Sequence, residues 1–575
     1  MFSLNNFYIL RVFSEFFLKL KIMNDLCENK KQFVILFCFS LFIIILEGYS
    51  LSIVLDVASS TTNKNFVSKN YFLTFFKISN IFIPVLLLFI FIFFKNILSI
   101  IFIIYKNHFL VKSQMTITNK VLAGFLNKDY NFFVNKNSSE LTSVMMQDIG
   151  LFMRTYTAVL HLLLESCLLV FILSYLFFLN IEIGLIFFFA ISFYFLTYMY
   201  IVKRKLIFLG SQRNILFQKI LKNLSETFAN FRELIIYDCK NIFINSLNYQ
   251  FKKFFRNLFQ ANILQQTSKV LIEQVFIAVI VSIIVFLIYS NETTELNSFL
   301  PLLAVYLFAF LKIIPSFNKI IMESQSYISN KLFVQKVYES IGDLNKNKLN
   351  NFLEFKNTIE IKKLNFKFND LANNTLKNIN LVINKNEKIG IVGRSGMGKT
   401  TFLNLLMGFF HPSSGKILVD GLSINMNLEG WRKKIAYVSQ SVYLLDESIG
   451  KNITFQNNKE LIDQDLLEKS IIFSGLGRYI KNLPLDMDTV VGERGSKISG
   501  GEILRIALAR AYYSNREIFI LDEFTSSLDA DTESEILNNL EFLDKTIIMV
   551  SHKQSTLKKC DKVYQLGPNG LLLNE

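Results

Sequence analysis

The sequence predicts a six-span α-helical membrane domain followed by an α/β P-loop nucleotide-binding domain. Of its 575 residues, 51% are hydrophobic and 60 are phenylalanine, which is rare in a soluble protein. The apolar residues form long runs before about residue 320 and short strand-like or helix-like pieces after about residue 356. The second part contains GRSGMGKTT, a glycine loop between an apolar strand and a helix. A chain of this length exceeds one ordinary domain.

The membrane domain is predicted from apolar stretches of about 20 residues, the length that a helical span requires. Long basic connections follow the second and fourth stretches, and short ones follow the third and fifth. Because basic loops stay in the cytoplasm, we expect both termini on the cytoplasmic side. The six stretches are 33–55, 80–105, 156–179, 181–202, 270–290 and 297–320.

The domain organisation follows from these runs. Residues 1–31 are interpreted as an amphipathic segment on the cytoplasmic surface. The transmembrane domain is predicted at 32–325, a linker at 326–355, and the nucleotide-binding domain at 356–575. The net charge of +15 lies largely between apolar runs, which favours membrane topology and predicts no nucleic-acid partner. The five cysteines are scattered and predict neither disulfides nor a metal site.

The long cytoplasmic connections are themselves patterned. NKVLAGFLNKDYNFFVNKNSSELTSVMMQDIG and KNLSETFANFRELIIYDCKN carry apolar residues at helical spacing. We therefore expect the spans to continue out of the membrane as helices, with a turn at each tip. In the first outer connection, residues 66–79 fit either a helix lying in the outer interface or an extension of the second span.

The glycine loop provides the first set of candidate nucleotide-binding residues. Its glycines let the backbone N–H groups wrap the phosphates of ATP. Lys399 is expected to reach the β- and γ-phosphates, and the Thr400 hydroxyl to ligate Mg²⁺. The predicted contact residues are Gly393, Arg394, Ser395, Gly396, Met397, Gly398, Lys399, Thr400 and Thr401.

Two later strands end in candidate catalytic residues. EIFILDEF is an apolar strand that ends in Asp522, placed to hold Mg²⁺, and Glu523, placed to polarise the attacking water. His552 follows the apolar strand of IIMVSHK. A lone histidine is often structural, but this one is expected at the nucleotide edge of the sheet.

KISGGEILRIALARA places Ser499, Gly500 and Gly501 at a predicted helix start. A hydroxyl, free N–H groups and the positive end of the helix dipole suit a γ-phosphate. Because the glycine loop already holds the chain's own nucleotide, this second site is expected to serve another chain. The sequence thus predicts a homodimer with two ATP molecules between the nucleotide-binding domains.

Taken together, these motifs resemble those of ABC transporters, specifically exporter-type half-transporters. Phe368 stands where this family has an adenine-stacking aromatic, although a core position is the alternative. The resemblance implies that Gln440 of VSQS takes part in catalysis and in holding Mg²⁺. It also implies that Ile498–Glu502 is the signature motif, Thr489–Gly495 the exporter X-loop, and Ser527-Leu528-Asp529 the loop that contacts nucleotide through Asp529.

One departure from the family pattern is Glu502, where the signature usually has glutamine. This carboxylate is expected to affect the hold on ATP, and its effect is left open. Within the family, the segments at 310–320 and 224–241 are most similar to flippases of lipid-linked oligosaccharides.

The function implied is an ATP-driven exporter or flippase of a lipid or amphipathic substrate, working by alternating access in the cell inner membrane with a cytoplasmic nucleotide-binding domain. A multidrug or lipid A-type exporter is the alternative within this class, and a nucleotide-gated channel is the alternative outside it. The sequence does not identify the transported substrate. It also leaves open whether the dimer is a homodimer or a heterodimer.

Lys95 falls well inside the second predicted span, and Lys312 falls inside the sixth. A cation in hydrocarbon is costly, so it either reaches the interface or faces a wet cavity. If both face the cavity, they form a positive surface suited to a phosphate or pyrophosphate group.

Overall fold

The computed structural model describes residues 30–62, 82–179, 181–289, 296–342, 354–368, 375–568 and 570–574. The predicted N-terminal segment, apart from its last two residues, and the segment 66–79 lie outside these ranges. The described chain divides into two compact units. The first comprises the helices up to residue 345 without residues 129–131, and the second comprises residues 346–575 with residues 129–131.

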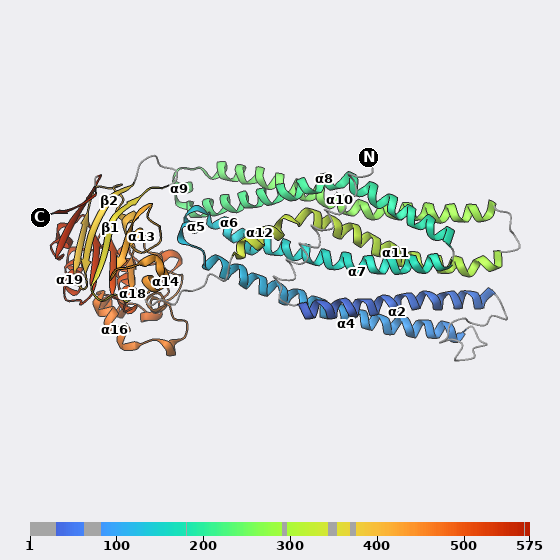
Figure 1. Cartoon of the computed structure of the whole chain (residues 1–575), viewed down its shortest axis with the longest axis horizontal. Coiled ribbons are helices and arrows are strands. Elements are labelled where there is room, and N and C mark those ends of the chain that lie inside the picture. Colours follow the sequence, from blue (N-terminus) through green and yellow to red (C-terminus); the bar gives the residue numbers. More distant parts are fainter. Residues whose placement is uncertain are drawn as a thin grey trace. The chain divides into compact units, whose positions relative to one another are not determined.

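The first unit is built from long helices, and six of those described are long and apolar enough to cross a membrane, as predicted (Figure 1). The six are α2 (Lys30–Thr62), α4 (Phe82–Leu126), α7 (Ile149–Leu179), α8 (Ile181–Ala229), α10 (Lys240–Tyr289) and α11 (Leu296–Asn330).

Three of these helices are much longer than a membrane is thick. At ~1.5 Å per residue, the 45 residues of α4 extend about 67 Å, twice the ~30 Å of hydrocarbon. α8 and α10 are longer still. The helices α5 (Tyr130–Asn135) and α6 (Ser138–Ser143), with a π-helical turn at Val144–Asp148, connect α4 to α7. The short α9 (Phe231–Ile236) connects α8 to α10. The predicted helical extensions with turns at their tips are therefore confirmed.

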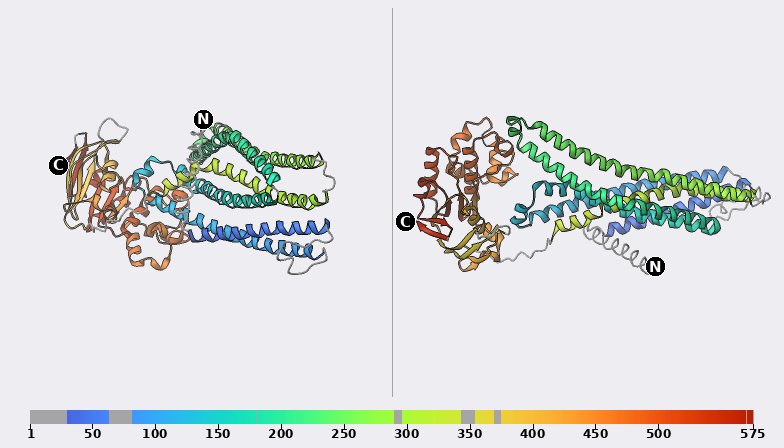
Figure 2. Two further views of the ribbon diagram at one scale, coloured as in Figure 1. Left: turned by 45° about the vertical axis from the view of Figure 1, so that its right-hand side comes forward. Right: turned by 90° about the horizontal axis from the view of Figure 1, so that it is seen from above.

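Close helix packing in the first unit depends on two glycines. A Cβ atom at Gly124 of α4 would lie 2.5 Å from the carbonyl oxygen of Ile341. A Cβ atom at Gly210 of α8 would lie 2.5 Å from the carbonyl oxygen of Ser329 on α11. Both clashes involve backbone atoms, so these helices approach one another only because the side chains are absent. The pairing of α2 with α4, and of α8 with α10, is visible in two further views (Figure 2).

Helix continues beyond the predicted end of the transmembrane domain. α12 (Leu332–Ile341) lies within the range predicted as a linker and packs on α4 and α7. Its buried residues Val334, Val337 and Ile341 recur at helical spacing and join the apolar cluster that includes Ile117 and Val121.

The second unit contains a four-stranded antiparallel sheet in the order β2-β1-β4-β5 and a six-stranded sheet in the order β10-β9-β3-β8-β7-β6. The strands are β1 (Thr358–Phe366), β2 (Leu376–Asn384), β3 (Lys388–Val392), β4 (Ser414–Val419), β5 (Leu422–Ser423), β6 (Ile435–Val438), β7 (Ile518–Asp522), β8 (Thr546–Val550), β9 (Lys562–Gly567) and β10 (Gly570–Asn574). The helices are α13 (Lys399–Leu406), α14 (Leu428–Arg432), α15 (Ile449–Thr454), α16 (Gln464–Phe473), α17 (Gly477–Lys481), α18 (Gly500–Tyr513), α19 (Ala530–Glu541) and α20 (Gln554–Leu557).

The six-stranded sheet positions the candidate site. β3, β8, β7 and β6 are parallel neighbours, and every residue of β7 and β8 is buried. Such runs of apolar residues suit strands that are covered on both faces. Because parallel strands end at the same edge, the glycine loop after β3 and the residues after β7 and β8 emerge side by side.

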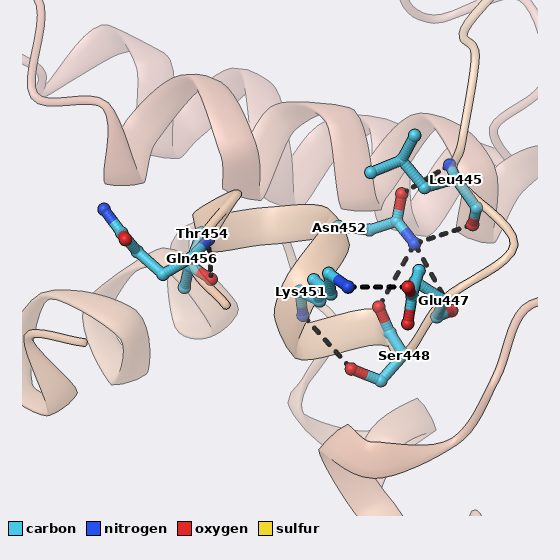
Figure 3. A network of polar contacts seen from close by, with 7 residues as sticks. All are labelled: Leu445, Glu447, Ser448, Lys451, Asn452, Thr454 and Gln456. Carbon is cyan, nitrogen blue, oxygen red and sulfur yellow. Dashed lines mark hydrogen bonds and ion pairs between the residues drawn. The ribbon is translucent and has the colours of Figure 1, made fainter. Parts of the chain in front are cut away.

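A network of polar contacts within residues 445–456 shapes the chain that follows Gln440 (Figure 3). The buried Asn452 side chain accepts from the Leu445 N–H at 2.8 Å and donates to the Leu445 carbonyl at 3.0 Å. Arg510 of α18 donates to the Asn452 carbonyl at 2.8 Å. Burial lowers the pKa of Arg510 to about 10. The loop after Gln440 is thereby tied to the helix that begins at Gly500.

Candidate nucleotide site

The glycine loop at Gly393–Gly398 leaves β3 and turns directly into α13. Gly396 and Gly398 have φ angles of 82° and 90°, in the left-handed region that glycine adopts without strain. A Cβ atom at Gly393 would lie 2.8 Å from the Leu566 carbonyl oxygen. The loop therefore requires glycines, and it presents the unpaired N–H groups of the α13 N-terminus to an anion.

Lys399 is the buried cation at the centre of the site. Its ammonium group donates to the Gly393 carbonyl at 2.7 Å and is in hydrogen-bond contact with His552 Nε2. Glu523 Oε1 lies 3.9 Å from the same ammonium and 3.6 Å from His552 Nε2. Residues from the ends of three strands thus meet around one cation.

Asp522 and Thr400 form the oxygen pair expected for a metal. The Thr400 hydroxyl donates to Asp522 Oδ2 at 3.3 Å. Burial raises the pKa of Asp522, the neighbouring charge of Glu523 adds to this, and the Thr400 hydrogen bond and Lys399 oppose it. A carboxylate and a hydroxyl are hard oxygen donors of the kind that Mg²⁺ binds together with phosphates and water. Among the described residues there is no larger cluster of His, Cys, Asp or Glu suited to a metal.

Glu523 has an unusual backbone conformation. Its φ angle is 48°, which is strained for a residue with a side chain. Its N–H donates to the Val550 carbonyl at 2.9 Å, and its Oε2 accepts from the Gln440 amide at 2.6 Å. Backbone strain of this kind persists where surrounding contacts hold the residue in place. Here the contacts of the Glu523 carboxylate with Gln440 and Lys399 do so.

The Ser499–Glu502 segment forms a capped helix start of its own. The Ser499 hydroxyl accepts from the Glu502 N–H at 3.4 Å at the beginning of α18. Among the described residues, no hydrogen bond or ion pair joins this segment to the loop Gly393–Thr401. Asp529 caps α19 by accepting from the Thr532 N–H at 3.0 Å and the Thr532 hydroxyl at 2.8 Å, and these bonds lower its pKa.

The Glu502 carboxylate has a partner that sequence reasoning missed. Arg505 donates to Glu502 Oε1 at 3.0 Å and to the Gly475 carbonyl at 3.1 Å. The signal was available in the sequence, because opposite charges three residues apart on a helix are neighbours. The added negative charge at the signature motif is therefore balanced within the chain.

Phe368 lies at the margin of the core. Its ring makes an edge contact with Phe366 at 4.8 Å between centroids and another with Phe410 at 5.7 Å. It is only partly buried, so one part of the ring is packed while another faces solvent. This geometry is compatible with the predicted adenine contact and with the core alternative.

We expect Phe368→Ala to raise the Michaelis constant for ATP about ten-fold, because stacking on a base contributes about 1–3 kcal/mol. Steady-state ATPase assays of the full chain measure this constant. Phe366→Leu, at a buried neighbouring ring, controls for a packing defect. An unchanged constant in Phe368→Ala would favour the core reading.

The lysines of the predicted spans have a partner that the sequence analysis did not identify. Glu47 of α2 is bonded to Lys95 of α4 through Oε2 and lies 2.7 Å from Lys312 of α11 through Oε1. Glu47 and Lys95 are buried, whereas the Lys312 side chain is 31% exposed. The two lysines share one carboxylate, so together with Glu47 they form a cluster of net charge +1 instead of two free cations. Glu47 was detectable as the one acidic residue within the run 33–55.

Residues 376–526 match a family model described as ABC transporter. An ATP-dependent lipid A-core flippase of Pseudoalteromonas translucida is 39% identical over 222 residues, which cover 38% of each chain. The alpha-hemolysin translocation ATP-binding protein of Escherichia coli O157:H7 is 37% identical over 38% of this chain and 31% of its own length. A multidrug resistance ABC transporter ATP-binding and permease protein of Lactococcus lactis is 36% identical over 36% of this chain.

The matched segment thus spans only about a third of the length of each of these relatives. A solved structure covers much more of the chain. A bacterial Atm1-family ABC exporter with ATP bound superposes with a TM-score of 0.79 over 93% of this chain and 94% of its own, at 18% identity. This likeness extends to the helical unit and concerns the fold.

Proposed function

Because an ABC transporter nucleotide-binding domain here follows six helices with the fold of an ABC exporter, we propose that the protein is an ATP-driven exporter or flippase. Its cycle couples ATP hydrolysis in the second unit to movement of a substrate past the helices of the first unit. ATP-dependent closure of two nucleotide-binding domains turns the cavity outward, and hydrolysis resets it.

The observation that supports ATP hydrolysis best is the convergence of Lys399, Glu523 and His552 around one point, with Gln440 on the Glu523 carboxylate. In this proposal Lys399 and the loop Gly393–Thr401 hold the phosphates of ATP. Glu523 orients and polarises the attacking water, and His552 and Gln440 hold the Glu523 carboxylate in position.

Magnesium fits the oxygen pair of Thr400 and Asp522, and when bound it neutralises charge on the β- and γ-phosphates. Gln440 is a further candidate ligand through its amide oxygen, since its amide nitrogen is the atom bonded to Glu523. Phe368 is proposed to contact adenine.

A second copy of the chain is proposed to complete each nucleotide site through Ser499, Gly500, Gly501, Glu502 and Asp529. This is supported by the independent capping of the Ser499 helix, which no described contact joins to the chain's own glycine loop. The tip around α9 adds a second argument, because it exposes large apolar side chains in the single chain. They are Phe228, Phe231, Ile235, Ile236 and Tyr237.

The proposed substrate is a lipid or another amphipathic molecule, with a lipid-linked oligosaccharide as one candidate. Some relatives are named lipid A-core flippase and others multidrug resistance transporter, so lipids and drugs are both candidate substrate classes. A nucleotide-gated channel is less favoured, because gating requires only binding while this chain retains the Glu523 and His552 geometry for hydrolysis. The proposed location is the inner membrane, with the domain ranges 32–325 and 356–575 as its membrane and cytoplasmic parts.

The proposal is tested in proteoliposomes that contain the purified chain. We expect ATP hydrolysis to be stimulated by members of a panel of polyprenyl-linked glycans, phospholipids and hydrophobic drugs, and the stimulating compound to cross the bilayer only with ATP. Hydrolysis without ATP-dependent movement of any compound in the panel would contradict an exporter. Compound movement supported equally by a non-hydrolysable ATP analogue would favour the channel.

A further inference from the structure

An open cavity of about 430 Å³, lined by both polar and apolar side chains, lies between α4, α7 and α11 of the helical unit. Most of its lining side chains are amides, hydroxyls and charged groups. The polar lining residues are Asn107, Gln114, Arg154, Thr157, Glu323 and Ser326. The sequence motifs and the nucleotide site make no use of these residues.

The ends of the predicted spans indicate the position of the cavity along the membrane normal. Its residues on α4 begin two positions after the span 80–105, those on α7 end at the start of 156–179, and those on α11 begin three positions after 297–320. At ~1.5 Å per residue, Arg154 and Glu323 lie within about 5 Å of the cytoplasmic end of the hydrocarbon. This is the level at which the polar heads of the cytoplasmic leaflet lie, about 5–7 Å thick on each side.

The two charges of the cavity are not equivalent. Glu323 accepts from His161 Nδ1 at 2.6 Å, and the other ring nitrogen of His161 lies 3.0 Å from the Lys106 ammonium. One oxygen of the Glu323 carboxylate therefore already has a hydrogen-bond partner within the chain. Arg154, by contrast, is exposed and has no carboxylate partner among the described residues. The Arg154 charge also acts on Arg213, a second arginine, which is bonded to Asn330 at 2.7 Å.

A guanidinium without a carboxylate partner among the described residues makes the cavity attractive to an anion. Arginine presents a fork of N–H donors that matches the oxygens of a phosphate. The amides and hydroxyls around Arg154 supply further donors, which suits a phosphate because it carries more acceptor oxygens than a carboxylate. The cavity is open rather than enclosed, so acyl or prenyl tails attached to the group need not enter it.

We propose that this cavity receives the phosphate-bearing head of an amphiphile from the cytoplasmic leaflet, with Arg154 as its main anion contact. The inference rests on the proposed function, since it assigns the site at which such an exporter first holds its substrate. The shared chemistry is a phosphate monoester or diester, whether carried by a lipid or by a free molecule.

The test measures binding of dioctanoyl phosphatidylglycerol to the purified full chain by isothermal titration calorimetry. We expect Arg154→Gln to weaken binding about ten-fold, in keeping with the loss of one charge-assisted contact. Arg154→Lys should recover part of the affinity, because it restores charge without the fork. Arg256→Gln, at an exposed arginine on α10, is the matched control and should bind as the wild type does.

Two further probes separate the sources of the phosphate. Dioctanoylglycerol, which has the tails without the phosphate, should not bind at the site. Glycerol 1-phosphate binding as tightly as the lipid identifies a free phosphate compound, and much weaker binding identifies a lipid head. The site is overturned if the wild type does not bind dioctanoyl phosphatidylglycerol, or if Arg154→Gln binds within two-fold of the wild type. ATP hydrolysis is measured separately, so a chain that binds the probe without hydrolysing ATP counts against the proposed function alone.

Discussion

Glu523→Gln is expected to bind ATP and dimerise but to lose at least about 100-fold in turnover, the usual scale for removing a group that transfers or positions a proton. Glutamine keeps the size and the hydrogen-bonding capacity of the side chain. It removes the negative charge that faces Lys399 at 3.9 Å and His552 at 3.6 Å. The loss should therefore appear in kcat, since the phosphate-holding groups remain in place.

Single-turnover hydrolysis and binding of a fluorescent ATP analogue separate these two effects. Glu541→Gln is the matched control, because Glu541 lies on α19 in the same unit and, among the described residues, its carboxylate pairs only with Lys559. The control should turn over as the wild type does. Turnover by Glu523→Gln within ten-fold of the control would contradict the proposed role of the carboxylate.

Glu47→Gln is expected to cost the helical unit about 3–5 kcal/mol, the scale for removing one partner of a buried ion pair. The substitution leaves Lys95 buried between helices without its carboxylate. Lys312 suffers less, because its side chain is partly exposed and can reach water. The midpoint of heat-induced loss of the monodisperse peak in size-exclusion chromatography measures the effect in detergent.

Two variants make this result specific to the buried cluster. Glu140→Gln breaks the exposed Glu140–Lys136 pair and should cost only about 0–1 kcal/mol. Glu47→Gln combined with Lys95→Gln should regain most of the lost stability, because no buried charge is left unpaired. A midpoint for Glu47→Gln equal to that of Glu140→Gln would show that the cluster does not hold these helices together.

The sequence by itself determined the number and type of the large elements. Spans require about 20 apolar residues, and the runs were long enough to be read without any tertiary information. The glycine loop could also be predicted from the sequence. Gly396 and Gly398 have positive φ angles, and this conformation depends on the residue type at each position and not on distant contacts. The helical extensions followed from periodicity over connections too long to be simple loops.

Only the tertiary structure decided which charged groups are paired. Lys95 and Glu47 are 48 positions apart, and no local pattern indicates that the helices α2 and α4 bring them together. The cavity around Arg154 is likewise lined by residues from three helices, α4, α7 and α11. Side-chain packing decides which of these helices lie next to one another. The physical reason is that backbone conformation and hydrophobic burial are encoded over a few turns of chain, whereas an ion pair or a cavity depends on the register in which distant helices pack.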